Sequence, residues 1–506
     1  MDRVSEKHAA REGGHRASPT SDTFREFIAS DWALRDATLP DLSEASRHAA
    51  PRRDALSAAF PGCRLVVPAG GLKIRSNDCD YQFRPHSAFA HLTGLGSDRE
   101  PDAVLVLEPR AQGGHDALIF FRPMAPRDDE EFFADARYGE FWVGARPTID
   151  QLSAETGLEA RHVDELESAL RADLGQVDLR IVREADAGLA ATVDELRAAA
   201  GVVQSLEGEQ EAHEGDAELS RRLSTMRLVK DDWEIGQMRL ACDGTARAFA
   251  AVVADLPEAV KRGRGERWVE GVFGLHARHH GNGVGYDSIC ASGDHANTLH
   301  WIRNTGDVGE DDLILIDAGV EVDSLFTADV TRTLPVSGRF SDAQRKVYDA
   351  VYAAQCAGID AVRPGATFKD VHAAAIRVIA EHVHAWGLLP DGVDVEASLA
   401  PEGQWHRRWM VHGTSHHLGL DVHDCQLALR EDYVEGTLAP GMILTVEPGL
   451  YFKADDLRVP PELRGIGVRI EDDILVTADG CENLTRALPR SSADVEAWMA
   501  DVLASG

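Results

Sequence analysis

Two aspartates mark the stretch of this chain with the clearest chemical potential. Residues 313–316 are an unbroken run of leucine and isoleucine, typical of a buried strand, and Asp317 follows at its end. Asp329 lies in the next strand-like segment, residues 326–333. If the two segments pair as a hairpin, both carboxylates point into one cleft. Taken alone, these residues are also ordinary turn signals, so other segments must decide.

Three downstream segments add histidines and carboxylates. Residues 410–424 hold four histidines, and two glycines among them disfavour a regular helix, which excludes the helical HExxH zinc pattern. Glu447 ends an apolar strand predicted from residue 443, and the proline after it stops further ladder pairing. In residues 465–473, a period of two puts Arg469 and Glu471 on one face. The four histidines are His412, His416, His417 and His423.

Four carboxylates that emerge from apolar strands predict a metal site. In one cleft without cations, Asp317, Asp329, Glu447 and Glu471 would repel and raise one another's pKa. Divalent ions remove that conflict. Oxygen-rich ligation with one imidazole suits manganese, cobalt, iron or zinc in a two-metal site better than a structural zinc, which prefers thiolates and more histidines.

The length and pattern of the chain predict two domains and a polar N-terminal arm, which must position these residues. A length of 506 residues exceeds what one core usually needs. We expect the arm at residues 1–45, an α/β domain at 46–215 and a second domain at 222–506, with residues 211–224 as the link. Strands are predicted at 64–68, 103–107 and 115–121, and helices at 148–157, 164–170, 235–252 and from Ser341 and Thr367, each followed three residues later by a capping partner, Gln344 or Asp370. Within residues 76–94, Asp78, Arg84, His86 and His91 are interpreted as structural packing.

The overall charge narrows the function classes. Lys and Arg number 52 against 85 Asp and Glu, a formal charge of -33, which argues against nucleic acid or an anionic membrane as partner. The opening has no apolar stretch behind its positive charges, and no run is long enough to span a bilayer, so we predict a cytoplasmic protein. Seven scattered cysteines without CxxC spacing are interpreted as reduced thiols.

The motif set resembles that of a known family. DAG…TADVTRT, HGTSHHLGLDVH, VEPGLY and GVRIEDD are similar, in order and content, to the motifs of aminopeptidase P (Xaa-Pro aminopeptidase), a branch of the pita-bread metallopeptidases. NDCDYQFRPHSAFAHLTG and RDDEEFFADARYGEFWVG look like its accessory N-terminal domain. The resemblance implies an α+β chain with a C-terminal pita-bread catalytic domain and a smaller α/β N-terminal domain. It also implies a homodimer or homotetramer.

Carried over residue by residue, the resemblance implies the metal ligands. Asp317 would chelate one ion, and Asp329 would bridge both. His416 and Glu447 would hold the other ion, with Glu471 as the second bridge. Manganese is the expected metal, and zinc, cobalt and iron fit the same donors.

The resemblance also implies a cleft and a reaction. His300, His412 and His423 match the substrate-cleft histidines, and Arg469 matches an arginine behind the ligands, for which a structural salt bridge is an equal alternative. A hydroxide bridging the two ions would hydrolyse the N-terminal Xaa-Pro bond, and Glu447 would move its proton to the leaving nitrogen. Substrates would be peptides with proline second, whose nitrogen offers no N–H and so needs a dedicated pocket.

Two departures and two alternatives remain. Twelve residues separate Asp317 from Asp329, one more than is usual in the family, so the hairpin turn must absorb an extra residue. His417 stands where an aromatic residue is common, which is expected to alter the pocket wall. A prolidase restricted to Xaa-Pro dipeptides would carry the same ligands. An inactive pita-bread domain that binds peptides would be expected to lack a ligand, and all five are present here.

Overall fold

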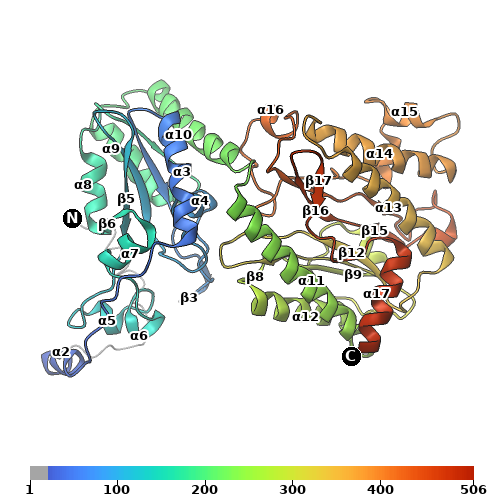
Figure 1. Cartoon of the computed structure of the whole chain (residues 1–506), viewed down its shortest axis with the longest axis horizontal. Helices are drawn as coiled ribbons and strands as arrows, with labels where there is room; N and C mark the ends of the chain where they lie inside the picture. The colour runs from blue at the N-terminus through green and yellow to red at the C-terminus, as the bar shows by residue number, and fades with distance from the viewer. Residues whose placement is uncertain (1–20, 506) are drawn as a thin grey trace.

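A computed structural model describes residues 21–505, which form two lobes joined side by side (Figure 1). The first twenty residues of the predicted arm lie outside the described residues. Its remainder carries the short helix α2 (Asp22–Ala29), which has no buried residue. Arg25 of this helix reaches Glu130, and Arg35 after it reaches Glu140, so this segment runs along the surface of the N-terminal lobe.

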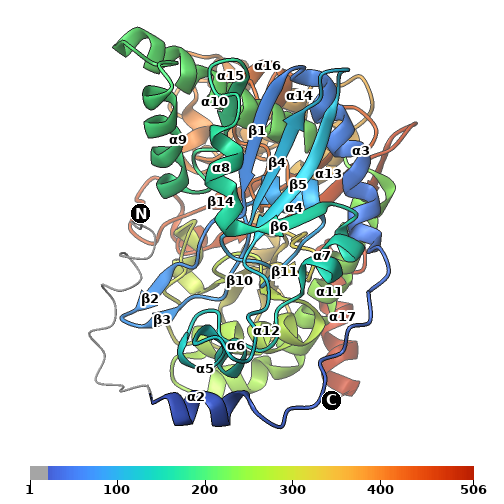
Figure 2. The same ribbon diagram turned by 90° about the vertical axis from the view of Figure 1, so that its left-hand side faces the viewer.

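A five-stranded mixed sheet forms the centre of the N-terminal lobe, in the order β6-β5-β4-β1-β7 (Figure 2). Leu65 and Val67 face one apolar core and Val66 faces another, so both sides of the sheet are covered by helices. This explains the unbroken apolar runs, because a strand buried on both faces has no polar side. The strands of this sheet are β1 Cys63–Pro68, β4 Val104–Pro109, β5 His115–Phe121, β6 Glu159–His162 and β7 Asp178–Ile181. Strands β2 Ile74–Ser76 and β3 Cys79–Asp80 form a separate pair. The helices after α2 are α3 Glu44–Ala59, α4 Ser87–Thr93, α5 Glu131–Ala134, α6 Glu140–Val143, α7 Ile149–Thr156, η1 Val163–Glu165, α8 Leu166–Arg171 and α9 Ala187–Ala199.

The segment predicted as the link is helical throughout. It belongs to α10 (Leu206–Met226), whose first turn is capped by the Ser205 hydroxyl. Leu219 and Leu223 of this helix pack into the core of the N-terminal lobe. The connection between the lobes is therefore a docked helix, although its polar composition suggested only a linker.

The C-terminal lobe places several small sheets between two helix pairs (Figure 1). One apolar core combines side chains of α11, α12, α13 and α14 with those of strands β10 and β15. The helices are α11 Asp232–Lys261, α12 Gly265–His280, η2 Gly293–Asn297, α13 Asp342–Ala361, α14 Phe368–Ala385, α15 Val395–Leu399, η3 Trp405–Arg408, α16 Arg430–Tyr433, η4 Pro461–Leu463 and α17 Ser492–Ser505. The strands are β8 Gly283–Val284, β9 Ile289–Ser292, β10 Leu313–Asp317, β11 Val320–Glu321, β12 Thr331–Pro335, β13 Ile443–Val446, β14 Gly449–Tyr451, β15 Gly467–Arg469, β16 Asp472–Val476 and β17 Cys481–Asn483.

Local capping signals fix the helix starts as predicted. The Ser341 hydroxyl accepts a hydrogen bond from the Gln344 N–H, and the Gln344 side chain accepts one from the Ser341 N–H. At the start of α14, the Asp370 carboxylate accepts a hydrogen bond from the Thr367 N–H at 2.8 Å. The pair of bonds at the start of α13 is reciprocal, and at both helix starts a side chain satisfies a backbone N–H donor.

The predicted hairpin is confirmed, and a three-residue loop closes its tip. Strand β10 pairs antiparallel with β12, so that Asp317 lies opposite Thr331. At the tip, the Leu325 N–H donates to the Val322 carbonyl at 2.7 Å, and the Val322 N–H donates to the Phe326 carbonyl at 2.9 Å. Leu325 has φ +74°, the left-handed conformation that closes a three-residue hairpin loop.

Two further expectations concern thiols and membranes. Each of the seven cysteines is a free thiol. Across residues 21–505, every helix is too short or too polar to cross a membrane.

Candidate metal centre and active site

Strand ends from separate small sheets deliver the four carboxylates to one place. Asp317 is the last residue of β10, and Asp329 stands just before β12. Glu447 follows β13 directly, and Glu471 lies between β15 and β16. The buried strands place each carboxylate at the edge of the core, where its side chain can leave the apolar interior.

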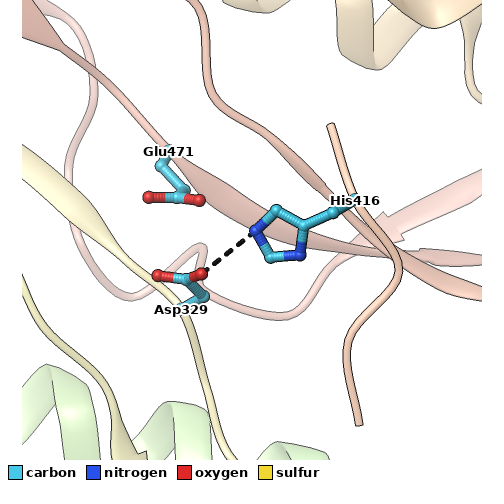
Figure 3. A group of neighbouring side chains, drawn as sticks. All are labelled: Asp329, His416 and Glu471. Atoms are coloured by element: carbon cyan, nitrogen blue, oxygen red, sulfur yellow. Dashed lines mark ion pairs between the residues drawn. The ribbon is translucent and has the colours of Figure 1, made fainter. Parts of the chain in front are cut away.

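Asp329, His416 and Glu471 form the tightest group of potential metal ligands. Among the residues that the structure describes, this is the group of three whose donor atoms all lie within 4.8 Å of one another. Figure 3 shows the imidazole edge of His416 directed at Asp329, with the Glu471 carboxylate facing the same space. The Nε2 atom of His416 lies 3.2 Å from Asp329 Oδ2 and 3.6 Å from Glu447 Oε1. One ring nitrogen therefore faces two of the predicted ligands.

Asp317 is held by an arginine and by a tyrosine that the sequence analysis missed. Arg469 donates from Nη2 to Asp317 Oδ2 at 2.5 Å. The Tyr286 hydroxyl lies 2.7 Å from Asp317 Oδ1 and 2.5 Å from Asp329 Oδ1. Tyr286 thereby links the two predicted aspartate ligands, and burial and both carboxylates raise its pKa well above 10. Its position before β9 carried no motif that could have identified it.

Thr331 and Arg469 organise the carboxylates further. The Thr331 hydroxyl donates to Glu471 Oε2 at 2.6 Å and accepts from Arg469 Nε at 3.1 Å. Arg469 also donates from Nη1 to the Tyr451 hydroxyl at 3.2 Å. Since its guanidinium is buried and divided among these groups, Arg469 has both a structural and an electrostatic effect on the site.

Carboxylates dominate the electrostatics of the site. Burial raises the pKa of Glu447 to about 7 and that of Glu471 well above its usual range, with the neighbouring carboxylates adding to both shifts. Burial likewise raises the pKa of Asp329. Burial opposes protonation of His416, but Asp329 and Glu447 outweigh it and raise its pKa to about 9. The cluster thus holds a cation more readily than it holds bare negative charge.

The predicted cleft histidines divide between two sides of this cluster. His412 approaches the Tyr451 hydroxyl through Nε2 at 2.7 Å, and its Nδ1 lies 3.8 Å from Glu447 Oε2. The ring of His423 lies edge-on to that of His416, with centroids 4.4 Å apart. Burial lowers the pKa of His412 to about 3, and burial with the charges of His416 and His300 lowers that of His423 to about 4. His300 is exposed and stands near enough to exert this effect on His423.

Two cavities adjoin these histidines. A groove of about 460 Å³ is lined by Leu299, Val411 and Tyr451, which are close neighbours of His300 and His412 in sequence or in space. A smaller cavity of about 140 Å³ lies where the lobes meet, between His86 and His423. Tyr451 connects the larger groove to the site, since its hydroxyl contacts His412 and Arg469, and His423 itself lines the smaller cavity.

His417, which was expected to alter the pocket wall, lies in the core instead. It is 1% exposed, and its ring stacks on Phe368 with centroids 5.1 Å apart and meets Tyr433 edge-on at 4.7 Å. It packs behind His416 and lines neither cavity, because adjacent residues of an extended segment face opposite sides.

The donor set fits divalent metal ions. Carboxylate oxygens with one imidazole nitrogen are the ligands of manganese, iron, cobalt and catalytic zinc. Bound cations would also balance the buried charges of Asp329, Glu447 and Glu471. Together with the two-lobed fold and the adjoining groove, this donor set is that of a metal-dependent hydrolase.

Comparison with known proteins identifies the family. The family models described as "Metallopeptidase family M24" and "Aminopeptidase P, N-terminal domain" match residues 236–478 and 49–182. Xaa-Pro aminopeptidase 1 of Streptomyces coelicolor is 52% identical over 483 residues, 95% of this chain and 92% of that protein. The chain belongs to the aminopeptidase P branch of the M24 metallopeptidases, as its motifs predicted.

Solved structures agree with this assignment. The Pseudomonas aeruginosa aminopeptidase PepP superimposes with a TM-score of 0.77 at 31% identity, covering 92% of this chain and 100% of that one. Aminopeptidase P from E. coli with the inhibitor Pro-Leu gives a TM-score of 0.76 at 30% identity, covering 92% and 99%. The expected fold, a C-terminal metallopeptidase domain with an accessory N-terminal domain, is confirmed.

Proposed function

We propose that this protein is a Xaa-Pro aminopeptidase that uses two divalent metal ions, with manganese as the best candidate. Asp317, Asp329, His416, Glu447 and Glu471 would hold the ions. When bound, these ions supply Lewis acidity and make hydroxide available near neutral pH. The proposal includes the domains 46–215 and 222–506 behind an arm at 1–45, a cytoplasmic location and a homodimeric or homotetrameric assembly.

In this proposal the chain's own groups bind the peptide and move protons. Glu447, which lies beside His416 at the proposed ion site, would accept a proton and pass it to the leaving prolyl nitrogen. His412 and His423 would donate hydrogen bonds to the oxygen on which negative charge develops. Arg469 would orient Asp317 through its hydrogen bond, and His300, next to the groove-lining Leu299, would contact the peptide.

The observation that carries the proposal is the group of Asp329, His416 and Glu471, with Glu447 3.6 Å from the same imidazole and Asp317 joined to Asp329 through Tyr286. The relatives are themselves called Xaa-Pro aminopeptidases, which supports the same substrate class here. These names favour an aminopeptidase over a dipeptide-specific prolidase. The presence of all five ligands argues against an inactive binding module.

The test combines metal analysis with three substrates. Asp329→Asn should lower the occupancy of both ions, since a bridging carboxylate contributes charge to each. Manganese-loaded protein should cleave Xaa-Pro-Yaa and leave Xaa-Ala-Yaa intact. Cleavage of Xaa-Pro alone would assign a prolidase, and cleavage of none of these peptides would indicate a binding module. A single ion at saturating manganese, or an unaffected Asp329→Asn variant, would refute the two-metal centre.

A further inference from the structure

One guanidinium of the N-terminal lobe reaches both segments that carry the predicted ligands. Arg84, which precedes α4, donates from Nε to Glu321 Oε2 at 2.8 Å and from Nη2 to the Leu420 carbonyl. Glu321 belongs to β11, in the hairpin between Asp317 and Asp329. Leu420 belongs to the histidine segment, between His416 and His423. Arg84 therefore joins two pieces of the site that are distant in sequence.

The two segments that Arg84 joins also contact each other. The Thr327 N–H of the hairpin donates to the Gly419 carbonyl of the histidine segment at 2.9 Å. Thr327 is two residues from Asp329, and Gly419 is three residues from His416. A shift of either segment therefore changes the distance between these two proposed ligands. The arginine closes a small structural unit consisting of hairpin, histidine segment and guanidinium.

Neighbouring contacts attach the same unit to the N-terminal lobe. The Ser87 hydroxyl donates to Asp421 Oδ1 at 2.6 Å, next to Leu420. At the hairpin tip, the Ser97 N–H donates to the Asp323 carbonyl at 3.1 Å. Arg84 differs from these contacts because it alone of the three binds both segments.

Because Glu321 is buried, losing its ion pair with Arg84 is costly in free energy. Glu321 is 5% exposed, and its other oxygen accepts a hydrogen bond from Asn282 Nδ2 at 2.7 Å. Loss of the guanidinium would leave a buried carboxylate without its cationic partner, which costs more than loss of an exposed pair. The hairpin would relax to bring Glu321 toward water, and that movement would be transmitted to Asp317 and Asp329.

We propose that Arg84 is a positioning residue for the metal centre, through which the accessory domain sets the metal affinity of the catalytic domain. The inference rests on the proposed metal centre. It gives a specific role to a residue that the sequence suggested was only packing. It also gives the N-terminal domain an effect on the centre without supplying a ligand.

The test measures manganese affinity of the full-length, chelator-treated protein by calorimetry. Arg84→Met keeps the aliphatic stem and removes the donors. Arg99→Met is the matched control, because Arg99 is 35% exposed against 34% for Arg84 and pairs with Glu155 inside the N-terminal lobe. Mutation of groups that orient ligands typically weakens metal binding by 10–100-fold, so Arg84→Met should raise the manganese Kd about tenfold. Saturating manganese should restore most of kcat, while Arg99→Met should match the wild type.

Two additional variants separate the possible outcomes. Arg84→Lys keeps the charge but cannot reach Glu321 and Leu420 together, so it should also weaken manganese binding, and it decides the question if Arg84→Met does not fold. A wild-type Kd in the folded Arg84 variant tested, with only a lower Tm, would overturn the inference. Asp329→Asn measured alongside separates the two proposals, because normal manganese binding by that variant would refute the metal centre itself.

Discussion

Substitution of Gly319 tests how closely the backbone after Asp317 must approach the backbone before Asp329. A Cβ atom at this position would lie 1.6 Å from the Ala328 carbonyl oxygen, whereas real Cβ contacts are essentially never under 3.0 Å. The difference between these values requires the two backbone segments to separate by about 1.4 Å. Gly319 is two residues from Asp317, and Ala328 is next to Asp329, so the separation falls directly on the predicted ligands.

Gly319→Ala should therefore disable the centre. A misplacement of about 1 Å can lower catalytic efficiency by about 10²-fold, so kcat/KM on an Xaa-Pro-Yaa peptide should fall at least that far. Metal content should fall with it. Gly271→Ala is the control, because a Cβ at that position in α12 meets nothing within 4 Å and alanine favours the helix. A Gly319→Ala protein with full metal content and kcat/KM within about threefold of wild type would refute the reasoning.

Three other changes probe chemistry, strain and acid stability. Glu447→Gln should reduce kcat by ~10²–10⁴ with little change in KM, and a variant that keeps its metal and near-normal kcat would leave His423 as the next candidate for the proton transfer. Leu325→Gly should relieve about 1–2 kcal/mol of left-handed strain but lose about 2–5 kcal/mol of packing from a fully buried side chain, so urea denaturation should show a net loss of stability, and a gain would contradict this balance. Burial opposes ionisation of Asp424, but the charges of Arg227 and Lys230 outweigh it and lower its pKa. Its stabilising effect is thus complete above its unfolded pKa of about 4 and lost as pH falls further, so the unfolding free energy of Asp424→Asn should depend less on pH below 4 than that of the wild type, whereas equal slopes would argue against this linkage.

Local patterns carried most of what could be predicted. The start of α13 depends on Ser341 and Gln344 alone, and the end of β10 at Asp317 on a short apolar run, so both were visible in the sequence. Tyr286 was not, because its two carboxylate contacts arise only when separate strands assemble. In the sequence, His417 could not be distinguished from the neighbouring cleft histidines. Its side chain points into the core because adjacent residues of an extended backbone face opposite sides.

The order in which the donors occur along the chain has a consequence for biosynthesis. The predicted ligands begin at residue 317 and end with Glu471, and they come from strands that pair over long separations. Such contacts form late, after the local helices. A nascent chain therefore cannot assemble the full donor set until residue 471 has been synthesised. In the proposed metal centre, selection among competing metals would then take place at a finished pocket, and a product terminated before residue 471 would lack one of the proposed donors from the outset.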